Sequence, residues 1–531
     1  MKKALLFIVL LLTIALLAAC GDSIATTTES TTPAQTISSS APITTAKAPE
    51  TTPVFSGAVT TTTKAPETTK IQHTTNPPET TKAPKTEPEL SDLLEFYYVP
   101  EDNGYHVVGF GSWEGSEITI PDEYDGEPVV ALGDRAFAYC FDLEKITLPD
   151  SVTKIGEGCF WGCDLLESIT FGKNFESIGE AAFYECLSLS DVTLPASLTH
   201  LGIVAFYSCE ALEFIEIPEG ISEIGMLTFC ECKNLNEVIL PNSITDISDQ
   251  AFYGCTNLAE INIPQNLARI GYYAFYNCDS IGNLSLPATL TEIGNYAFAG
   301  CDGLSEITIS ENNSVYSSEN HALFNKDKTV LYTVYANTES FTIPESVTTI
   351  ADYAFYGCTK LKSIIVPSAV TSIGREAFSG CSSLAGISVD DNNTAYCGID
   401  GVLYNKNTTT LIAVPATFTA YTFPQTVTAI EEYAFCGCEQ LKTITIPASV
   451  RHIGSAAFYG CSGLTEIVIP KTVLTLGEWA FFACGSLKTV YCEATSQPSG
   501  WDENWKYGID ENAKILFGNG WSYIDGIPTK K

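Results

Sequence analysis

The stretch Leu441–Gly463, LKTITIPASVRHIGSAAFYGCSG, decides the fold, because most of the chain consists of variants of it. The unit is 23 residues long, and its skeleton is L-x-x-I-x-I-P-x-x-V-x-x-I-G-x-x-A-F-x-x-C. Ten of the twelve spacings between successive Phe-x-x-Cys cysteines are 23 residues, and the other two are both 57. A period of this length is typical of a solenoid, in which short coils stack in line. The thirteen ladder cysteines, as we call them, are Cys140, Cys163, Cys186, Cys209, Cys232, Cys255, Cys278, Cys301, Cys358, Cys381, Cys438, Cys461 and Cys484.

Each unit contains a segment of the form I-x-I-P, in which β-branched residues alternate with polar ones before a proline ends the pairing. The first and third residues of such a strand should point into the coil, and the residue between them outward. One coil cannot bury its apolar residues alone, so each needs neighbours and both ends of the stack need caps. The sixteen segments open at Ile118, Ile146, Ile169, Val192, Ile215, Val238, Ile261, Leu284, Ile307, Phe341, Ile364, Ile387, Tyr421, Ile444, Ile467 and Val490.

We therefore predict an α/β repeat, a leucine-rich repeat solenoid with a parallel β-sheet of about 16 short strands and short helical turns. The x-x-A-F-x-x-C segment should supply at most one turn of helix. The glycine after the second Ile, as in Gly179 and Gly454, is expected at a tight bend with positive φ. We interpret the ladder cysteines as small buried apolar residues, and the alternative is cross-linking between rungs.

With these repeats, the chain resembles the BspA-like (treponemal-type) leucine-rich repeat family of bacterial surface proteins. The resemblance runs from about Tyr97 to Trp521. Where the common leucine-rich pattern has Asn, this chain usually has Ser, Thr or Gly, as at Ser151 and Gly220. The resemblance implies an exported protein linked with adhesion to host proteins or neighbouring cells.

The first 89 residues predict an export signal followed by a stalk. Residues 1–20 place two lysines before a short apolar run, which indicates a signal peptide and is too short for a membrane span. The run ends in Leu-Ala-Ala-Cys-Gly, which resembles a lipoprotein processing site with Cys20 as the lipidated residue. The alternative is an ordinary cleaved signal peptide. Residues 21–89 are dominated by Thr, Pro, Ser and Ala, so we expect a disordered stalk.

These segments predict the localisation of the protein. It would be lipid-anchored on the extracellular face of the bacterial cell membrane and exposed at the cell surface. A lipid anchor with more than one acyl chain would hold it firmly.

The rest of the chain divides into a solenoid between two caps. Residues 90–130 should form an N-terminal cap with the first coil strand, and residues 131–489 the solenoid. Residues 490–531 leave the period and contain three tryptophans, consistent with a C-terminal cap. Within the solenoid, two longer turns at 307–341 and 387–421 share one sequence pattern, which predicts the same hairpin in each.

Composition excludes one class of partner and favours another. Asp plus Glu number 63 against 27 Lys plus Arg, a formal charge of −36. Nucleic acid binding needs cations that neutralise phosphates, so we predict no nucleic acid partner. A chain this acidic favours cationic patches or Ca²⁺ as partners. The cysteines outside the ladder lack zinc-site spacing, and no catalytic motif is present, so we predict no metal, no cofactor and no enzymatic activity.

The outward residues of the predicted strands form the candidate binding surface. In the middle turns they combine carboxylates with one aromatic and one aliphatic residue, which suits anchoring of a basic protein segment. The alternative is an ordinary solvated sheet face. The candidate ligand-binding residues are Asp191, Phe214, Glu216, Glu237, Ile239, Glu260 and Glu306.

A second candidate surface is the aromatic row after the ladder phenylalanines. Aromatic side chains that repeat at coil spacing either stack on sugars or seal the coil edge by stacking on one another, and we favour sealing. The row contains Trp161, Tyr184, Tyr207, Tyr253, Tyr276, Tyr356, Tyr459 and Phe482.

The sequence thus leaves three functional hypotheses. The first is an adhesin-like binding protein that recognises a host or neighbouring-cell protein or polysaccharide without chemistry. The second is a structural spacer or surface-layer scaffold without a specific ligand. The third is a partner that presents substrate to a separate enzyme.

Overall fold

The computed structural model describes residues 93–335, 338–524 and 527–530. All of them belong to the second of two units of the chain, Pro84–Lys531. The predicted signal peptide and stalk, with Cys20, lie outside the described residues. Within the described ranges, no helix is long and apolar enough to cross a membrane.

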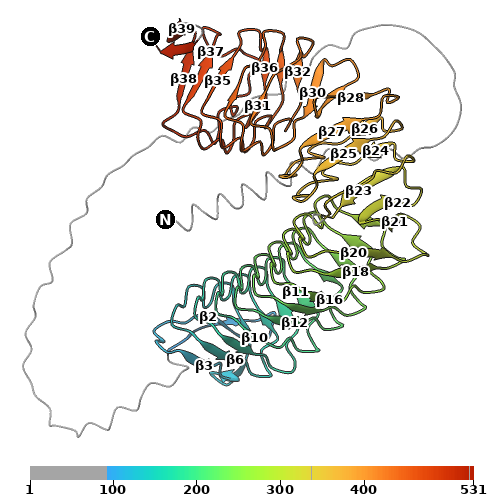
Figure 1. Ribbon diagram of the computed structural model, residues 1–531. Coiled ribbons are helices and arrows are strands. Elements are labelled where there is room, and N and C mark those ends of the chain that lie inside the picture. Colours follow the sequence, from blue (N-terminus) through green and yellow to red (C-terminus); the bar gives the residue numbers. More distant parts are fainter. Residues whose placement is uncertain (1–92, 336–337, 525–526, 531) are drawn as a thin grey trace, which may run out of the picture. The chain divides into compact units, whose positions relative to one another are not determined.

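The described chain is a stack of coils that follow one another in sequence order (Figure 1). One strand from each coil contributes to one face, which we call the strand face, and neighbouring strands pair in parallel one coil apart, as Ile146 does with Ile169. Fifteen of the sixteen predicted segments contain such a strand. These are β3 (Glu117–Thr119), β6 (Lys145–Thr147), β8 (Ser168–Thr170), β10 (Asp191–Val192), β12 (Phe214–Glu216), β14 (Glu237–Ile239), β16 (Glu260–Ile261), β18 (Asn283–Leu286), β20 (Glu306–Ile309), β25 (Ser363–Val366), β27 (Gly386–Val389), β31 (Ala420–Tyr421), β33 (Thr443–Ile444), β35 (Glu466–Ile469) and β37 (Thr489–Cys492).

The solenoid is confirmed, but the strand face is divided into short ladders instead of one continuous sheet. The sixteenth segment, at Phe341, forms no strand. Its phenyl ring is instead buried edge-on to Phe355, with 5.8 Å between ring centroids.

A second row of parallel strands, which the sequence did not predict, runs along the side where the second Ile of each unit lies. Most of its strands are two residues long and end at the residue before the glycine position. They are β5 (Glu127–Leu132), β7 (Lys154–Ile155), β9 (Ser177–Ile178), β11 (His200–Leu201), β13 (Glu223–Ile224), β15 (Asp246–Ile247), β17 (Arg269–Ile270), β19 (Glu292–Ile293), β24 (Thr349–Ile350), β26 (Ser372–Ile373), β32 (Ala429–Ile430), β34 (His452–Ile453) and β36 (Thr475–Leu476).

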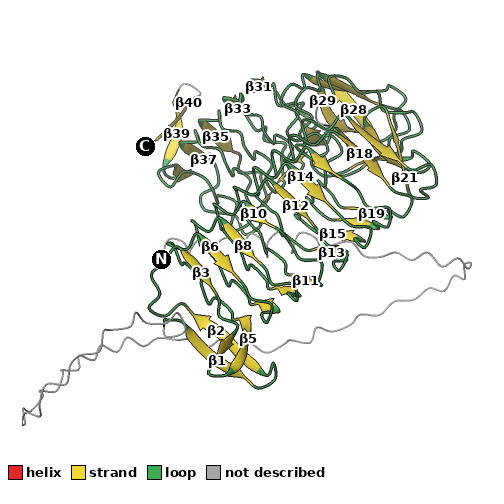
Figure 2. Ribbon diagram, turned by 90° about the horizontal axis from the view of Figure 1, so that it is seen from below, coloured by secondary structure: helices red, strands yellow, loops and turns green. Residues whose placement is uncertain are grey.

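The x-x-A-F-x-x-C segments are successive turns, and no helix occurs among the described residues (Figure 2). In the coil of Phe183, positive φ angles of 52° at Ala181 and 56° at Glu185 flank the phenylalanine. Left-handed residues at these two places prevent a helix. The backbone N–H groups of Ala181, Phe183 and Glu185 instead donate to carbonyls of the next coil, at 2.8 to 3.0 Å. The predicted helical turn is therefore wrong, because its hydrogen bonds run between coils.

The glycine after the second Ile has a different role from the one its position suggested. None of these glycines has positive φ. A Cβ on Gly179 would lie 2.5 Å from the carbonyl carbon of Gly156 in the preceding coil. A Cβ on Gly454 would lie 2.5 Å from the backbone nitrogen of Glu432. Glycine is required here because neighbouring backbones approach closely.

The ladder phenylalanines and cysteines fill the interior. Successive rings stack at 5.1 to 5.6 Å between centroids from Phe137 to Phe275, with interplanar angles of at most 20°. Each ladder cysteine is buried and forms no disulfide. In ten of them the thiol donates to the carbonyl of a ladder phenylalanine one coil earlier, as Cys186 Sγ does to Phe160 O at 3.1 Å. The cysteine is thus a small apolar residue that also satisfies a buried carbonyl.

Both ends of the stack are covered by aromatic side chains. At the N-terminal end, the antiparallel hairpin β1 (Glu95–Val99) and β2 (Gly104–Gly109) lies beside β5, and Phe110 stacks on Phe137 (Figure 2). The short strand β4 (Glu123–Tyr124) also pairs with β5. At the C-terminal end, β38 (Lys514–Phe517) extends the strand face next to β37, and buried Trp505 closes the phenylalanine stack against Phe481. A last hairpin joins β39 (Trp521–Ile524) to β40 (Ile527–Lys530).

Each long turn forms the same three-stranded antiparallel unit, one strand more than the hairpin that the shared sequence pattern predicts. The first contains β21 (Tyr316–Glu319), β22 (Ala322–Asn325) and β23 (Val330–Val334), and the second contains β28 (Tyr396–Ile399), β29 (Val402–Asn405) and β30 (Thr410–Ala413). The last strand of each unit then pairs in parallel with the second row of the next coil. The second-row ladder that precedes a long turn ends at a tyrosine side chain. The Tyr396 hydroxyl, for example, accepts a hydrogen bond from the backbone N–H of Ile373 at 3.0 Å.

The glycine contact predicts a large effect of a single methyl group. We expect Gly179→Ala to lower the free energy of unfolding by about 2–3 kcal/mol, because the new Cβ meets backbone that cannot rotate away. Gly282→Ala is the matched control, since a Cβ there has no neighbour within 4 Å, and it should be neutral or slightly stabilising. Chemical denaturation of the full chain measures both. Equal effects would contradict the close-approach explanation.

Burial of the thiols predicts their reactivity. It raises the pKa of Cys232 and of Cys301 to about 12, so the reactive thiolate is scarce at neutral pH. Iodoacetamide at pH 8 should therefore modify half-buried Cys397 in the folded chain well before any ladder cysteine. Peptide mass spectrometry after timed labelling measures each site. Rapid labelling of ladder cysteines without unfolding would show that the ladder is not a closed interior.

Candidate functional site

Five of the seven candidate residues come together on the strand face. Parallel pairing of β12, β14 and β16 places Phe214, Glu237 and Glu260 in one row and Glu216 beside Ile239 in the next. Figure 2 shows β12 and β14 side by side along this face. We call these five residues the acidic–aromatic patch.

The other two candidates lie on neighbouring ladders. Asp191 belongs to β10, which pairs with β8, and Glu306 belongs to β20, which pairs with β18. Neither strand pairs with the β12–β14–β16 ladder. Both side chains are exposed on the same face as the patch, but they are not part of it.

The apolar members of the patch are unusually accessible for residues of their type. Phe214 is 43% exposed and Ile239 is 37% exposed, while the inward residues Ile215 and Val238 between them are buried. The alternation therefore follows the strand period, and it leaves one large aromatic and one aliphatic side chain in solvent. Exposed apolar side chains ringed by polar ones mark interaction sites more often than isolated ones do.

The charges of the patch are unbalanced. None of Glu216, Glu237 and Glu260 forms an ion pair with a cation of the described chain. Glu237 and Glu260 are register partners on adjacent parallel strands. Like charges in this arrangement repel and cost stability. A cationic partner would relieve that repulsion.

A second apolar row was not singled out in the sequence. Phe141, Leu165 and Leu187 follow ladder cysteines by one or two residues, and they are 51%, 48% and 40% exposed. The signal that marks them is an apolar residue at positions that carry Asp, Glu or Thr in other coils, such as Asp164, Glu210 and Thr256.

The aromatic row after the ladder phenylalanines seals the coil edge, as the favoured interpretation predicts. Tyr184 stacks on Tyr207 with ring centroids 4.7 Å apart, and Tyr253 stacks on Tyr276 at 4.9 Å. Tyr184 is buried, and burial raises the pKa of its hydroxyl.

The potential metal ligands of the described residues are dispersed along the chain. No group of three or more His, Cys, Asp and Glu side chains in this part of the chain is arranged to hold a metal ion. His200 and His452 are exposed, and His452 Nδ1 lies 2.9 Å from the hydroxyl of Thr475. Asp390 begins a turn in which its carboxylate accepts a hydrogen bond from the Asn392 N–H at 2.8 Å.

Comparison with known families now places the chain. The model described as BspA type leucine-rich repeat region matches residues 130–239, 222–333, 328–418 and 413–500. The chain belongs to the BspA-type leucine-rich repeat family. A search of the curated proteins finds no match.

Solved structures of leucine-rich repeat proteins are similar to this BspA-type chain. A leucine-rich cell surface protein of Faecalibacterium prausnitzii is 27% identical, over 78% of this chain and 96% of that one, with a TM-score of 0.48. A leucine-rich repeat protein of T. pallidum is 30% identical, over 37% of this chain and 91% of that one, with a TM-score of 0.35. A leucine-rich repeat protein of Bacteroides ovatus is 23% identical, over 80% and 98% of the two chains, with a TM-score of 0.43.

The repulsion within the patch predicts that removing one charge stabilises this BspA-type solenoid. Glu237→Gln should raise the free energy of unfolding by about 0.5 kcal/mol at low ionic strength, and added salt should reduce the gain. Glu466→Gln is the matched control, because Glu466 occupies the same strand position on β35 and its partner is Thr489. Denaturation of the full chain at two salt concentrations measures the effect. Destabilisation by Glu237→Gln alone would show that this carboxylate has a structural partner.

Proposed function

We propose that this BspA-type chain is a non-catalytic, adhesin-like cell-surface binding protein. It recognises a protein or polysaccharide of the host or of a neighbouring cell on its extended strand face. The observation that carries the proposal is the acidic–aromatic patch, where Phe214 and Ile239 are exposed among three carboxylates that have no described cationic partner. Leucine-rich repeat solenoids generally bind proteins on such extended surfaces and are generally non-catalytic.

Within this proposal, Phe214 anchors the partner and the carboxylates select it. An exposed aromatic side chain gives a large contact area for little loss of side-chain entropy, and aromatic residues dominate binding energy at interfaces. Glu216, Glu237 and Glu260 surround it and favour a basic segment. Asp191 and Glu306 extend the negative field along the face and increase the rate of encounter.

The proposal includes the way in which the binding face is presented. Cys20 becomes the first residue and carries the lipid after the signal peptide that precedes it is cleaved off, and residues 21–89 form the stalk. The caps at 90–130 and 490–531 protect the ends of the solenoid at 131–489. The description of the Faecalibacterium prausnitzii protein as a cell surface protein supports this localisation.

Binding to host cells tests the strand face. Cells that display the full chain should adhere to host or neighbouring-cell surfaces, and Phe214→Ala should reduce adhesion about tenfold or more, because truncation of an aromatic anchor costs about 2 kcal/mol. The triple variant Glu216→Gln, Glu237→Gln, Glu260→Gln should weaken adhesion and flatten its dependence on salt.

A charge-matched variant is the control for that experiment. Glu439→Gln, Glu466→Gln and Glu503→Gln remove the same net charge from exposed positions outside the patch, and adhesion should be unchanged. If the patch variants adhere as well as the unmodified chain, the strand-face site is wrong. If the full chain binds nothing in a broad protein and glycan array, the spacer hypothesis replaces the proposal.

A further inference from the structure

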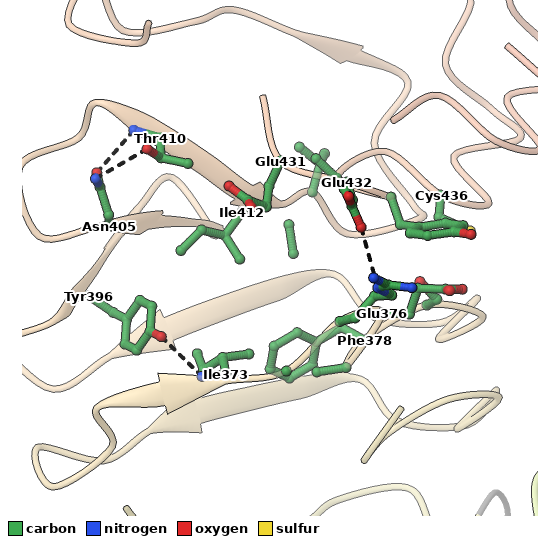
Figure 3. Close-up of a pocket in the computed structure, with 18 residues that line it drawn as sticks. Ile373, Glu376, Phe378, Tyr396, Asn405, Thr410, Ile412, Glu431, Glu432 and Cys436 are labelled. Atoms are coloured by element: carbon green, nitrogen blue, oxygen red, sulfur yellow. Dashed lines mark hydrogen bonds and ion pairs between the residues drawn. The ribbon is translucent and has the colours of Figure 1, made fainter. Parts of the chain in front are cut away.

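The second long turn leaves a pocket in the stack that the proposed binding function does not use. The pocket has a volume of about 520 Å³ and lies between the coil of Phe378 and the coil of Phe435. Figure 3 shows its two walls, with Ile373, Phe378 and Tyr396 on one side and Ile412 and Glu431 on the other. Glu376, Glu432 and Cys436 lie together at one end.

The first long turn provides an internal comparison, because its residues match those of the second at an offset of 80. The corresponding space there is only about 30 Å³. Tyr332 and Tyr296 both line it, and Tyr296 packs against Tyr353 and against Tyr356. In the second junction the positions of Tyr332, Tyr296 and Tyr356 are taken by Ile412, Glu376 and Cys436. The loss of three aromatic rings therefore opens the pocket.

The coils on either side of the pocket are not joined by the ladder that joins other coils. The N–H of Phe355 donates to the carbonyl of Ala377, but the N–H of Phe378 has no backbone acceptor among the described residues. The pocket thus lies at a break in the stack. A ligand can occupy it without displacing backbone hydrogen bonds between the phenylalanine segments of the two coils.

The charged groups of the pocket do not balance. Arg375 pairs with Glu432 at 3.3 Å across the break. Glu376 and Glu431 have no ion-pair partner among the described cations. Glu376 accepts one hydrogen bond, from the Tyr296 hydroxyl at 3.5 Å. Glu431 is exposed to solvent, whereas Glu376 is half-buried. The nearby Arg375 charge only partly compensates the Glu376 carboxylate, which lies beside aromatic rings that favour cations.

We propose that this pocket binds a small organic cation, an ammonium or guanidinium group carried on a compact apolar or aromatic body. The cation lies beside the Glu376 carboxylate, and the body packs on Phe378, Tyr396 and Ile412. Neutral molecules of the same shape do not compensate the carboxylates, and anions are repelled by them. This site is separate from the acidic–aromatic patch.

The pKa values of the pocket carboxyl groups are consistent with a cationic ligand and determine how its affinity depends on pH. Burial raises the pKa of Glu376 to about 7, and burial with the nearby Glu432 raises that of Glu431. A cation prefers the ionised carboxylates, so its affinity should rise as pH increases through 7 and level off above it. The charged and titratable groups that face Glu376 are Arg375, Asp352, Glu432, Tyr273, Tyr296, Tyr353, Tyr356, Tyr433, Tyr459 and Cys436.

Calorimetric titration of the full chain with benzylamine, and with benzyl alcohol as its neutral counterpart, tests the proposal. Benzylamine should bind at pH 8, about tenfold more weakly for each pH unit below 7, while benzyl alcohol should show no measurable binding. Glu376→Gln keeps the shape of the side chain and should weaken benzylamine about tenfold at pH 8. It should also remove most of the pH dependence, which a merely structural residue would not do.

Ile412→Tyr restores the ring of the first junction and should abolish binding by filling the pocket. Tyr332→Phe at the first junction is the matched control and should leave binding unchanged, as should Phe214→Ala on the strand face. If benzylamine does not bind the pocket, the adhesion proposal still stands. If the patch variants do not change adhesion, the amine-site proposal still stands. Equal binding of benzylamine and benzyl alcohol, no binding of benzylamine at millimolar concentration, or full binding by Ile412→Tyr would overturn the proposal.

Discussion

The structure depends on hydrogen bonds that leave each coil for the next. In the segment around a ladder phenylalanine such as Phe183, left-handed residues stand two positions before and two positions after the phenylalanine, and three N–H groups point along the stack instead of closing a helical turn. Each left-handed non-glycine residue costs of order 1 kcal/mol, and the cost is offset only when a neighbouring coil supplies carbonyls. The thiol of the ladder cysteine adds one further donor in the opposite direction, to a carbonyl of the preceding coil. A single coil would lose all of these bonds, so it has no stable isolated form.

The same constraint explains why the long turns matter. Where a long turn is inserted, the phenylalanine stack and the backbone ladder both stop, and a three-stranded unit continues the second row instead. The buried core accordingly divides into three clusters, which meet near residues 322–324 and 402–404. At the first break tyrosines fill the space, and at the second they do not. A ligand pocket can form at such a break without disturbing the regular coils. A binding site on the strand face, in contrast, depends only on the outward residues of the strands.

The sequence predicted the parts of the fold that have a pattern of their own. Alternation in segments such as Ile444-Thr445-Ile446 identified the strand face, and the outward positions of Phe214 and Glu237 followed from the period of two. The two-residue strands of the second row are too short to show any alternation. The turn around Phe183 has the spacing of a helical turn, and nothing in Ala181 or Glu185 indicates positive φ. The absence of a side chain at Gly179 fits a left-handed bend and a close backbone contact equally well, and only the position of Gly156 decides between them. The shared pattern of the two long turns does not predict the pocket, because the pocket arises from the three positions at which Ile412, Glu376 and Cys436 replace tyrosines.

Amide hydrogen exchange at the ladder phenylalanines tests the central claim most directly, because it reports the bonds between coils one rung at a time. The account predicts strong protection at Phe183, Phe206 and Phe252, whose N–H groups donate to the next coil, and much faster exchange at Phe298 and Phe378, which have no such acceptor in the described chain. Uniform protection along the ladder, or slowest exchange at Phe298 and Phe378, would contradict it.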